Sequence, residues 1–81
     1  MRLKFGRLIN ISLRNGDGVN VPNGELWKYT ATLESAARLN MDGVTTTEHI
    51  VNGYAVNGTR FYADNGSVKI QGIAFKVVKE E

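Results

Sequence analysis

Apolar and polar side chains alternate along the first segment of the chain, over residues 3–13. In an extended strand, Ile9 and Ile11 would lie on one face and the polar side chains between them on the other. Gly6 stands where a bulge would bend such a strand. The pattern predicts a long N-terminal β-strand that ends in a turn at residues 15–18, where two glycines supply positive φ angles.

A different pattern begins at Thr32 and predicts two short helices joined by a glycine turn. The hydroxyl of Thr32 can cap the first helix, in which apolar side chains recur at helical spacing as far as Asn40. Thr45 can cap the second helix, and Asn52-Gly53 is typical of a helix end. The segment before Thr32 would be extended.

Strand-like alternation returns in the C-terminal part of the chain. Asn65-Gly66 is a strong local signal for a hairpin, and a two-residue turn there would pair Ala63 with Val68. Apolar and polar residues alternate again after Gly72, so the second strand is predicted to continue, with a bulge, to Val78.

The chain holds five Asn-Gly dipeptides, and the one at residues 52–53 leaves an alternative open. Residues 48–56 could form a hairpin over this dipeptide in place of the second helix. The choice decides whether a helix is present that could enter a DNA groove.

These elements predict a single α+β domain over residues 1–81. The N-terminal strand and the C-terminal hairpin would form a small antiparallel sheet, with the two helices packed on one face. A winged helix-turn-helix is one variant of this arrangement.

Composition and charge limit the protein's environment. The chain of 81 residues has no cysteine, so it contains neither disulfides nor thiolate metal sites, and a reducing cytoplasm suits it. No apolar run approaches the roughly 20 residues of a membrane span, and polar residues interrupt any signal-peptide core. We therefore expect a soluble, cytoplasmic domain that does not enter a membrane.

The net charge is only +2, but four cations, Arg2, Lys4, Arg7 and Arg14, precede the first acid, Asp17. Two interpretations stay open. A basic strand attracts nucleic acid, and charges also protect an edge strand against aggregation.

The side chains offer no recognisable catalytic set. The only histidine, His49, has Glu48 as its nearest acid in the sequence, and adjacent helical residues point in different directions. One histidine among scattered acids also makes a poor metal site. We expect a protein that is not an enzyme and that needs no metal or cofactor.

Residues 32–62 carry the one segment with a functional pattern. Within them, residues 35–39, 45–50, 52–53 and 58–61 resemble the small NUMOD helix-turn-helix modules of phage-encoded homing endonucleases. They resemble more loosely the DNA-binding heads of excisionases and MerR-type proteins. The resemblance implies a small regulatory DNA-binding protein of phage or mobile-element type, and a homodimer would supply paired half-sites.

The same resemblance implies which side chains would contact DNA. The second helix would enter the major groove, while side chains of the first helix and the hairpin would neutralise phosphates or reach the minor groove. The candidate DNA-binding residues are Arg38, Thr46, Thr47, His49, Asn52, Arg60, Tyr62 and Lys69.

A second function class is a protein-interaction module, such as a phage-type inhibitor that docks on a host protein through an edge strand or a loop. The modest net charge suits it equally well. Aromatic side chains could also form a stacking platform for single-stranded nucleic acid. We expect Trp27, Phe61 and Phe75 to be buried, which would leave Tyr29, Tyr54 and Tyr62 for stacking.

Overall fold

The structure is a computed structural model that describes residues 2–78. Within this range the chain forms eight β-strands and no helix. The strands are β1 (Arg2–Leu13), β2 (Gly18–Asn20), β3 (Glu25–Leu33), β4 (Arg38–Met41), β5 (Val44–Thr46), β6 (Ile50–Val56), β7 (Arg60–Asp64) and β8 (Val68–Val78).

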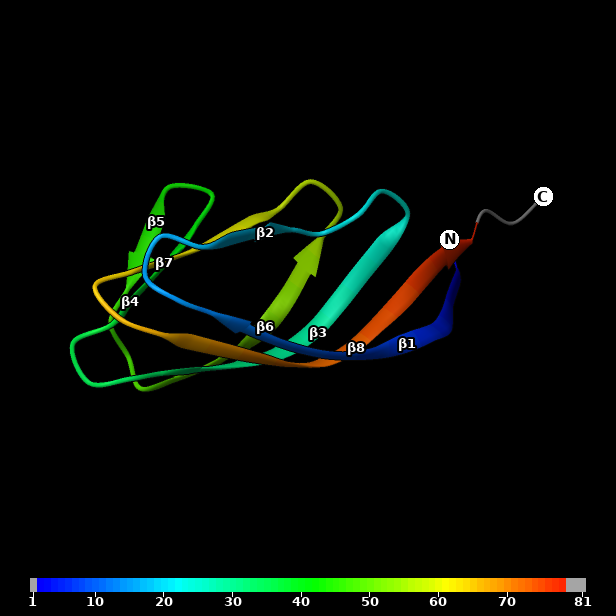
Figure 1. Cartoon of the computed structure of the whole chain (residues 1–81). Helices are drawn as coiled ribbons and strands as arrows, with labels where there is room; N and C mark the ends of the chain where they lie inside the picture. The colour runs from blue at the N-terminus through cyan, green and yellow to red at the C-terminus, as the bar shows by residue number, and fades with distance from the viewer. Residues whose placement is uncertain (1, 79–81) are drawn as a thin grey trace.

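The strands form two four-stranded sheets that pack face to face (Figure 1). Sheet A has the order β1-β8-β3-β6 and sheet B the order β2-β7-β4-β5, and all pairings are antiparallel. Apart from the β4–β5 hairpin, consecutive strands belong to different sheets. This strand order is that of an eight-stranded jelly roll.

Three aromatic rings join the two sheets at the centre of the core. The rings of Trp27 (β3) and Phe61 (β7) are stacked with their centroids 6.0 Å apart, and Tyr29 (β3) meets Phe61 edge-on at 5.0 Å. The predicted burial of Trp27 and Phe61 is confirmed, whereas Phe75 is only half-buried. Burial raises the pKa of Tyr29, and its hydroxyl lies 3.3 Å from the Sδ atom of Met41.

The predictions for the two ends of the chain are confirmed in their main features. β1 covers the predicted strand, and its register against β8 shifts between Phe5 and Arg7, as expected of a bulge at Gly6. β8 runs to Val78 as predicted, but the bulge predicted within it is wrong, because its register against β3 is continuous and its pairing with β1 shifts only at Gly6. A Cβ atom on Gly6 would lie 2.7 Å from the carbonyl oxygen of Ala74, so the bulge requires glycine.

The predicted α+β class is wrong, because the chain is all-β over the described residues. Instead of a first helix, β3 ends at Leu33, residues 34–37 turn, and β4 begins at Arg38. In β4 the side chain of Leu39 is buried while those on either side are more exposed, a period of two that pairs with β7. A helix of about two turns is marginal alone, and strand pairing outweighs its propensity.

The second predicted helix, and with it the helix-turn-helix, is wrong for the same reason. Residues 45–52 are divided between β5, a connection and β6. The alternative hairpin over Asn52-Gly53 is also wrong, since both residues lie inside β6 and pair with Thr30 and Tyr29 of β3.

The predicted hairpin at Asn65-Gly66 is a turn, but not a hairpin. It leads from β7 in sheet B to β8 in sheet A, so Ala63 pairs with Leu39 and Val68 pairs with Leu13 and Leu33. Asn65 and Gly66 both have positive φ, at 59° and 150°. The predicted turn at these two residues is therefore confirmed, but the predicted pairing of the two strands that it joins is wrong.

Because the described residues form no helix, none of them makes a helix that could cross a membrane.

Candidate interaction surface

The eight predicted DNA-binding residues do not come together on one surface. Arg38, Arg60 and Tyr62 lie on the outer face of sheet B, and Asn52 and Lys69 lie on the outer face of sheet A, on the opposite side of the molecule. The remaining three residues, Thr46, Thr47 and His49, lie at the end of β5 and in the connection to β6.

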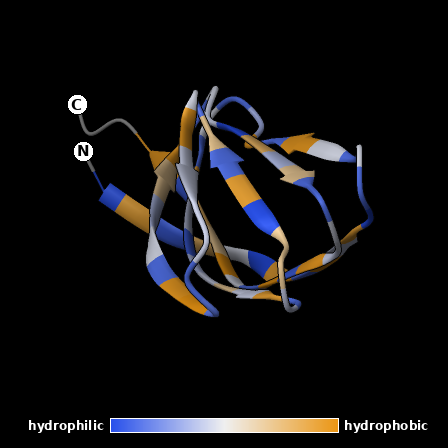
Figure 2. Ribbon diagram, turned by 90° about the vertical axis from the view of Figure 1, so that its left-hand side faces the viewer, coloured by the Kyte–Doolittle hydropathy of each residue, from blue (hydrophilic) through white to orange (hydrophobic). Residues whose placement is uncertain are grey.

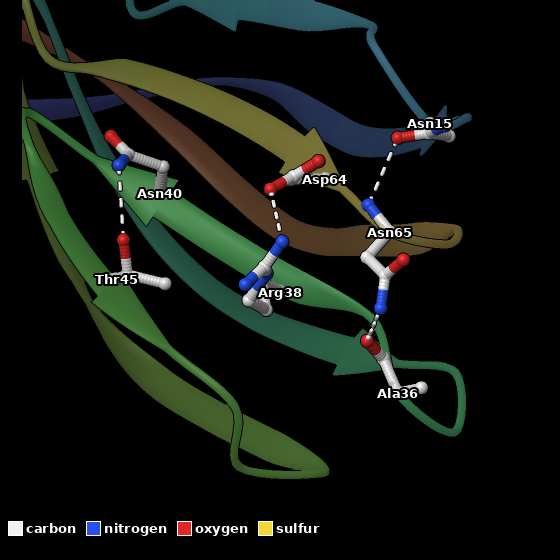
Figure 3. A network of polar contacts seen from close by, with 7 residues as sticks. All are labelled: Asn15, Ala36, Arg38, Asn40, Thr45, Asp64 and Asn65. Atoms are coloured by element: carbon white, nitrogen blue, oxygen red, sulfur yellow. Dashed lines mark hydrogen bonds and ion pairs between the residues drawn. The ribbon is translucent and has the colours of Figure 1, made fainter.

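Side chains on the outer face of sheet B largely bind one another (Figure 3). Arg38 donates to a carboxylate oxygen of Asp64 at 2.8 Å, and the amide of Asn40 donates to the Thr45 hydroxyl at 3.1 Å. Arg60 donates to the Asn20 side chain at 3.3 Å. The charge of Arg38 is therefore already balanced, and polar side chains on this face largely satisfy one another's hydrogen-bonding groups.

The turn from β7 to β8 is held by a second set of contacts in the same view (Figure 3). The side chain of Asn65 donates to the carbonyl oxygen of Ala36 at 2.9 Å, and its backbone N–H donates to the side chain of Asn15 at 2.9 Å. One asparagine thus links three connections at this end of the sandwich, a structural role.

A groove of about 430 Å³ brings two of the predicted residues, His49 and Lys69, together. The Nδ1 atom of His49 lies 2.9 Å from the carbonyl oxygen of Leu33 and therefore carries the proton in the neutral ring. Among the described residues, the ion pairs involve neither Lys69 nor Arg14. We call this groove the basic groove; its lining includes Ser12, Arg14, Thr32, Glu34, His49, Ser67 and Lys69.

The outer face of sheet A carries a surface that was not predicted from the sequence. Three cross-strand rows of large apolar side chains run over one end of this face: Leu3 beside Val77; Phe5, Phe75, Leu26 and Val56; and Leu8, Ile73, Lys28 and Tyr54. Lys28 is the one charged member. We call these residues the apolar surface, and Figure 2 shows how hydrophobic and hydrophilic positions alternate along the strands.

The apolar surface is large for a domain of this size. Its five most exposed side chains, Leu3, Phe5, Leu8, Tyr54 and Val56, are 42%, 59%, 73%, 66% and 57% exposed. At about 200 Å² for a fully exposed large side chain, they present roughly 600 Å². This value is at the upper end of the largest apolar patches on monomeric proteins, which are often functional.

The bulge at Gly6 creates this surface by reversing the alternation of β1. Before the bulge, Leu3 and Phe5 point outward; after it, Leu8 points outward and Ile9 is buried. The signal was present in the sequence, since a bulge places positions 5 and 8 on one face. This signal is missed when all odd-numbered residues of β1 are assumed to lie on one face.

The charges around sheet A are almost all positive. Its four strands contain a single acid, Glu25. One oxygen of Glu25 accepts from Arg7 at 3.1 Å and from the indole N–H of Trp27 at 2.9 Å, and Arg7 also lies over the Trp27 ring. Glu25 is thus already engaged, and between residues 2 and 78 no other cation of sheet A takes part in an ion pair.

The potential metal-ligating side chains of the described residues are scattered over the structure. Within residues 2–78, no three histidine, cysteine or acidic side chains lie close enough together to hold a metal ion. The aromatic core occupies the interior between the sheets.

Fold and surface together define a small jelly-roll domain with an exposed apolar face on one sheet. No protein-family model, curated protein or solved structure matches the chain. Its function must therefore be argued from its own surface.

Proposed function

We propose that the chain is a protein-interaction module that docks on another protein through the apolar surface of sheet A. The observation that carries this proposal is the cluster of apolar side chains on the outer face of one sheet, which are exposed on the edge strands β1 and β6 and half-buried on β3 and β8. An antiparallel sheet that covers a core with one face normally presents polar side chains on the other. Sheet A does so only at the end that holds Asn10 and Ser12.

The size of the apolar surface sets the largest contribution that its burial can make to a complex. Burial of roughly 600 Å² of apolar surface at about 25 cal/mol per Å² contributes on the order of 15 kcal/mol before costs. Association costs about 4–15 kcal/mol in lost translational and rotational freedom. Burial of the apolar surface by a partner can therefore offset the cost of association.

Photocrosslinking tests this proposal with a matched pair of exposed tyrosines on opposite faces. Tyr54 belongs to the apolar surface, whereas Tyr62 lies on the outer face of sheet B. Each is replaced in turn by the photoreactive residue p-benzoylphenylalanine, and the protein is irradiated in an extract of its native cells. We expect a discrete adduct with another protein from position 54 and none from position 62. Equal labelling from both positions, or none from either, would contradict the proposal.

DNA binding is a second candidate, supported by the basic groove rather than by a helix. The groove places Lys69, Arg14 and His49 around several hydroxyl groups, and Lys28 and Tyr54 lie on the same face of sheet A. Cations beside an exposed aromatic ring suit a single strand, whose phosphates and bases they can bind. This candidate predicts that a labelled single-stranded oligonucleotide binds at low salt, and that Lys69→Ala weakens the binding. Fluorescence anisotropy that shows no binding at low salt would exclude it.

A further inference from the structure

We propose that β1 binds an extended peptide segment of the partner as a fifth strand of sheet A, and that this segment alternates acidic and apolar residues. The inference rests on the proposed function, because it names how the partner reaches the apolar surface.

β1 is the most available edge in the molecule. It contains 12 residues, roughly 40 Å of chain at about 3.3 Å per residue, and it pairs with β8 on one side only. No strand of the described part of the chain pairs with its other side, so the backbone groups there can pair with an added strand. The edges of sheet B, β2 and β5, contain only three residues each, and β6 contains seven.

The first residues of β1 present two chemically distinct faces along this edge. Leu3 and Phe5 belong to the apolar surface, and the alternating positions Arg2 and Lys4 point to the opposite face. Lys76 of β8 pairs with Lys4 and adds a third cation to that face. Among the described residues, none of these three cations takes part in an ion pair.

An added strand would have its own side chains beside both faces, since cross-strand neighbours lie about 5 Å apart. Side chains next to Leu3 and Phe5 must be apolar to be buried, and those next to Arg2 and Lys4 must be acidic to balance the charge. The complement of the edge is therefore a segment with a period of two, acid and apolar in turn.

A second copy of the chain fits this edge poorly. Pairing of β1 with β1 of another copy brings two basic strands together, and neither strand contains an acid. Like charges on paired strands are destabilising. Charge complementarity therefore favours an acidic partner segment.

The test uses three labelled synthetic peptides and the full chain. One peptide alternates glutamate and valine, the second has the same composition in scrambled order, and the third alternates lysine and valine. We expect fluorescence anisotropy to show binding of the alternating acidic peptide, with affinity at least about tenfold above that of either other peptide. Backbone amides of β1 should become protected from hydrogen exchange when the peptide binds.

Charge reversal provides the matched variants. Lys4→Glu should weaken binding of the acidic peptide about tenfold, whereas Arg60→Glu, which changes the net charge equally on the outer face of sheet B, should have little effect. Circular dichroism confirms that both variants fold.

Several results would overturn the inference. These are equal binding of the alternating and scrambled acidic peptides, no binding of either, or unchanged exchange of the β1 amides. A dimer of the free chain with protected β1 amides would assign the edge to a second copy. An adduct from position 54 that persists with any of these results leaves the proposed function standing, so the two failures are distinguishable.

Discussion

The bulge at Gly6 allows a specific prediction about the effect on stability of truncating Leu8 and Ile9, which are neighbours in β1. Leu8 is 73% exposed on the apolar surface, and Ile9 is 3% exposed in the core. Replacing each in turn by alanine removes a similar amount of apolar side chain from adjacent positions of one strand. The difference between the two variants therefore reports burial rather than strand propensity.

The expected magnitudes follow from that burial. Truncation of a buried isoleucine to alanine costs about 2–5 kcal/mol, so we expect about 3 kcal/mol for Ile9→Ala. A domain of this length is stable by roughly 4–12 kcal/mol, which makes the loss a large fraction of the total. Leu8→Ala should cost less than about 1 kcal/mol, because most of the side chain already lies in water.

Equilibrium unfolding in urea measures both values. The fluorescence of Trp27 serves as the probe, since the indole is 1% exposed and stacked on Phe61. With a slope of about 1–3 kcal/mol per M, Ile9→Ala should lower the midpoint by more than about 1 M and Leu8→Ala only slightly. If Leu8→Ala costs as much as Ile9→Ala, the assignment of inward and outward side chains in β1 is wrong. Leu8 would then no longer belong to the apolar surface.

Other predictions concern the bulge, the ion pair and the buried tyrosine. Gly6→Ala places a methyl group 2.7 Å from the carbonyl oxygen of Ala74 and should destabilise by about 1–3 kcal/mol in the same urea assay. Asp64→Ala breaks the half-exposed ion pair with Arg38 and should cost less than about 1 kcal/mol; a larger loss would contradict the exposure of the pair. Burial raises the pKa of Tyr29 in the folded state, so stability is fully present below the ordinary tyrosine pKa of about 10 and falls as the pH rises through the folded value. Thermal unfolding at alkaline pH should show this loss, and Tyr29→Phe should reduce it.

The sequence predicts strands well where one strand carries its own signal. β1 alternates over many residues and contains its bulge glycine, and β8 continues to its predicted end. The turn at Asn65-Gly66 is also recognisable, because its left-handed backbone needs such residues. Local sequence is sufficient to predict these features because each depends only on residues that are close together in the chain.

The pairing of strands and the central segment could not be predicted in this way. Ala36 and Ala37 fit a helix by propensity, but Ala36 has a φ of 70° in a turn and Ala37 is buried beside the start of β4. A short apolar segment satisfies helical and strand spacing equally, and only the partner β7 decides between them. The predicted DNA-binding residues lie on both sheets because neither of the two predicted helices is present in the described part of the chain.

One edge strand links the fold to the proposed function. The simplest protection of a long edge is charge, and Arg2, Lys4 and Arg7 of β1 fit that role. Protection alone does not require Leu3, Phe5 and Leu8 on the other face, and it does not require a bulge that brings Leu8 to that face. A strand selected only to stay unpaired would gain from polar residues at these positions. The combination of an open edge, cations on one side and apolar side chains on the other therefore favours an edge that pairs with a selected partner over an edge that avoids pairing.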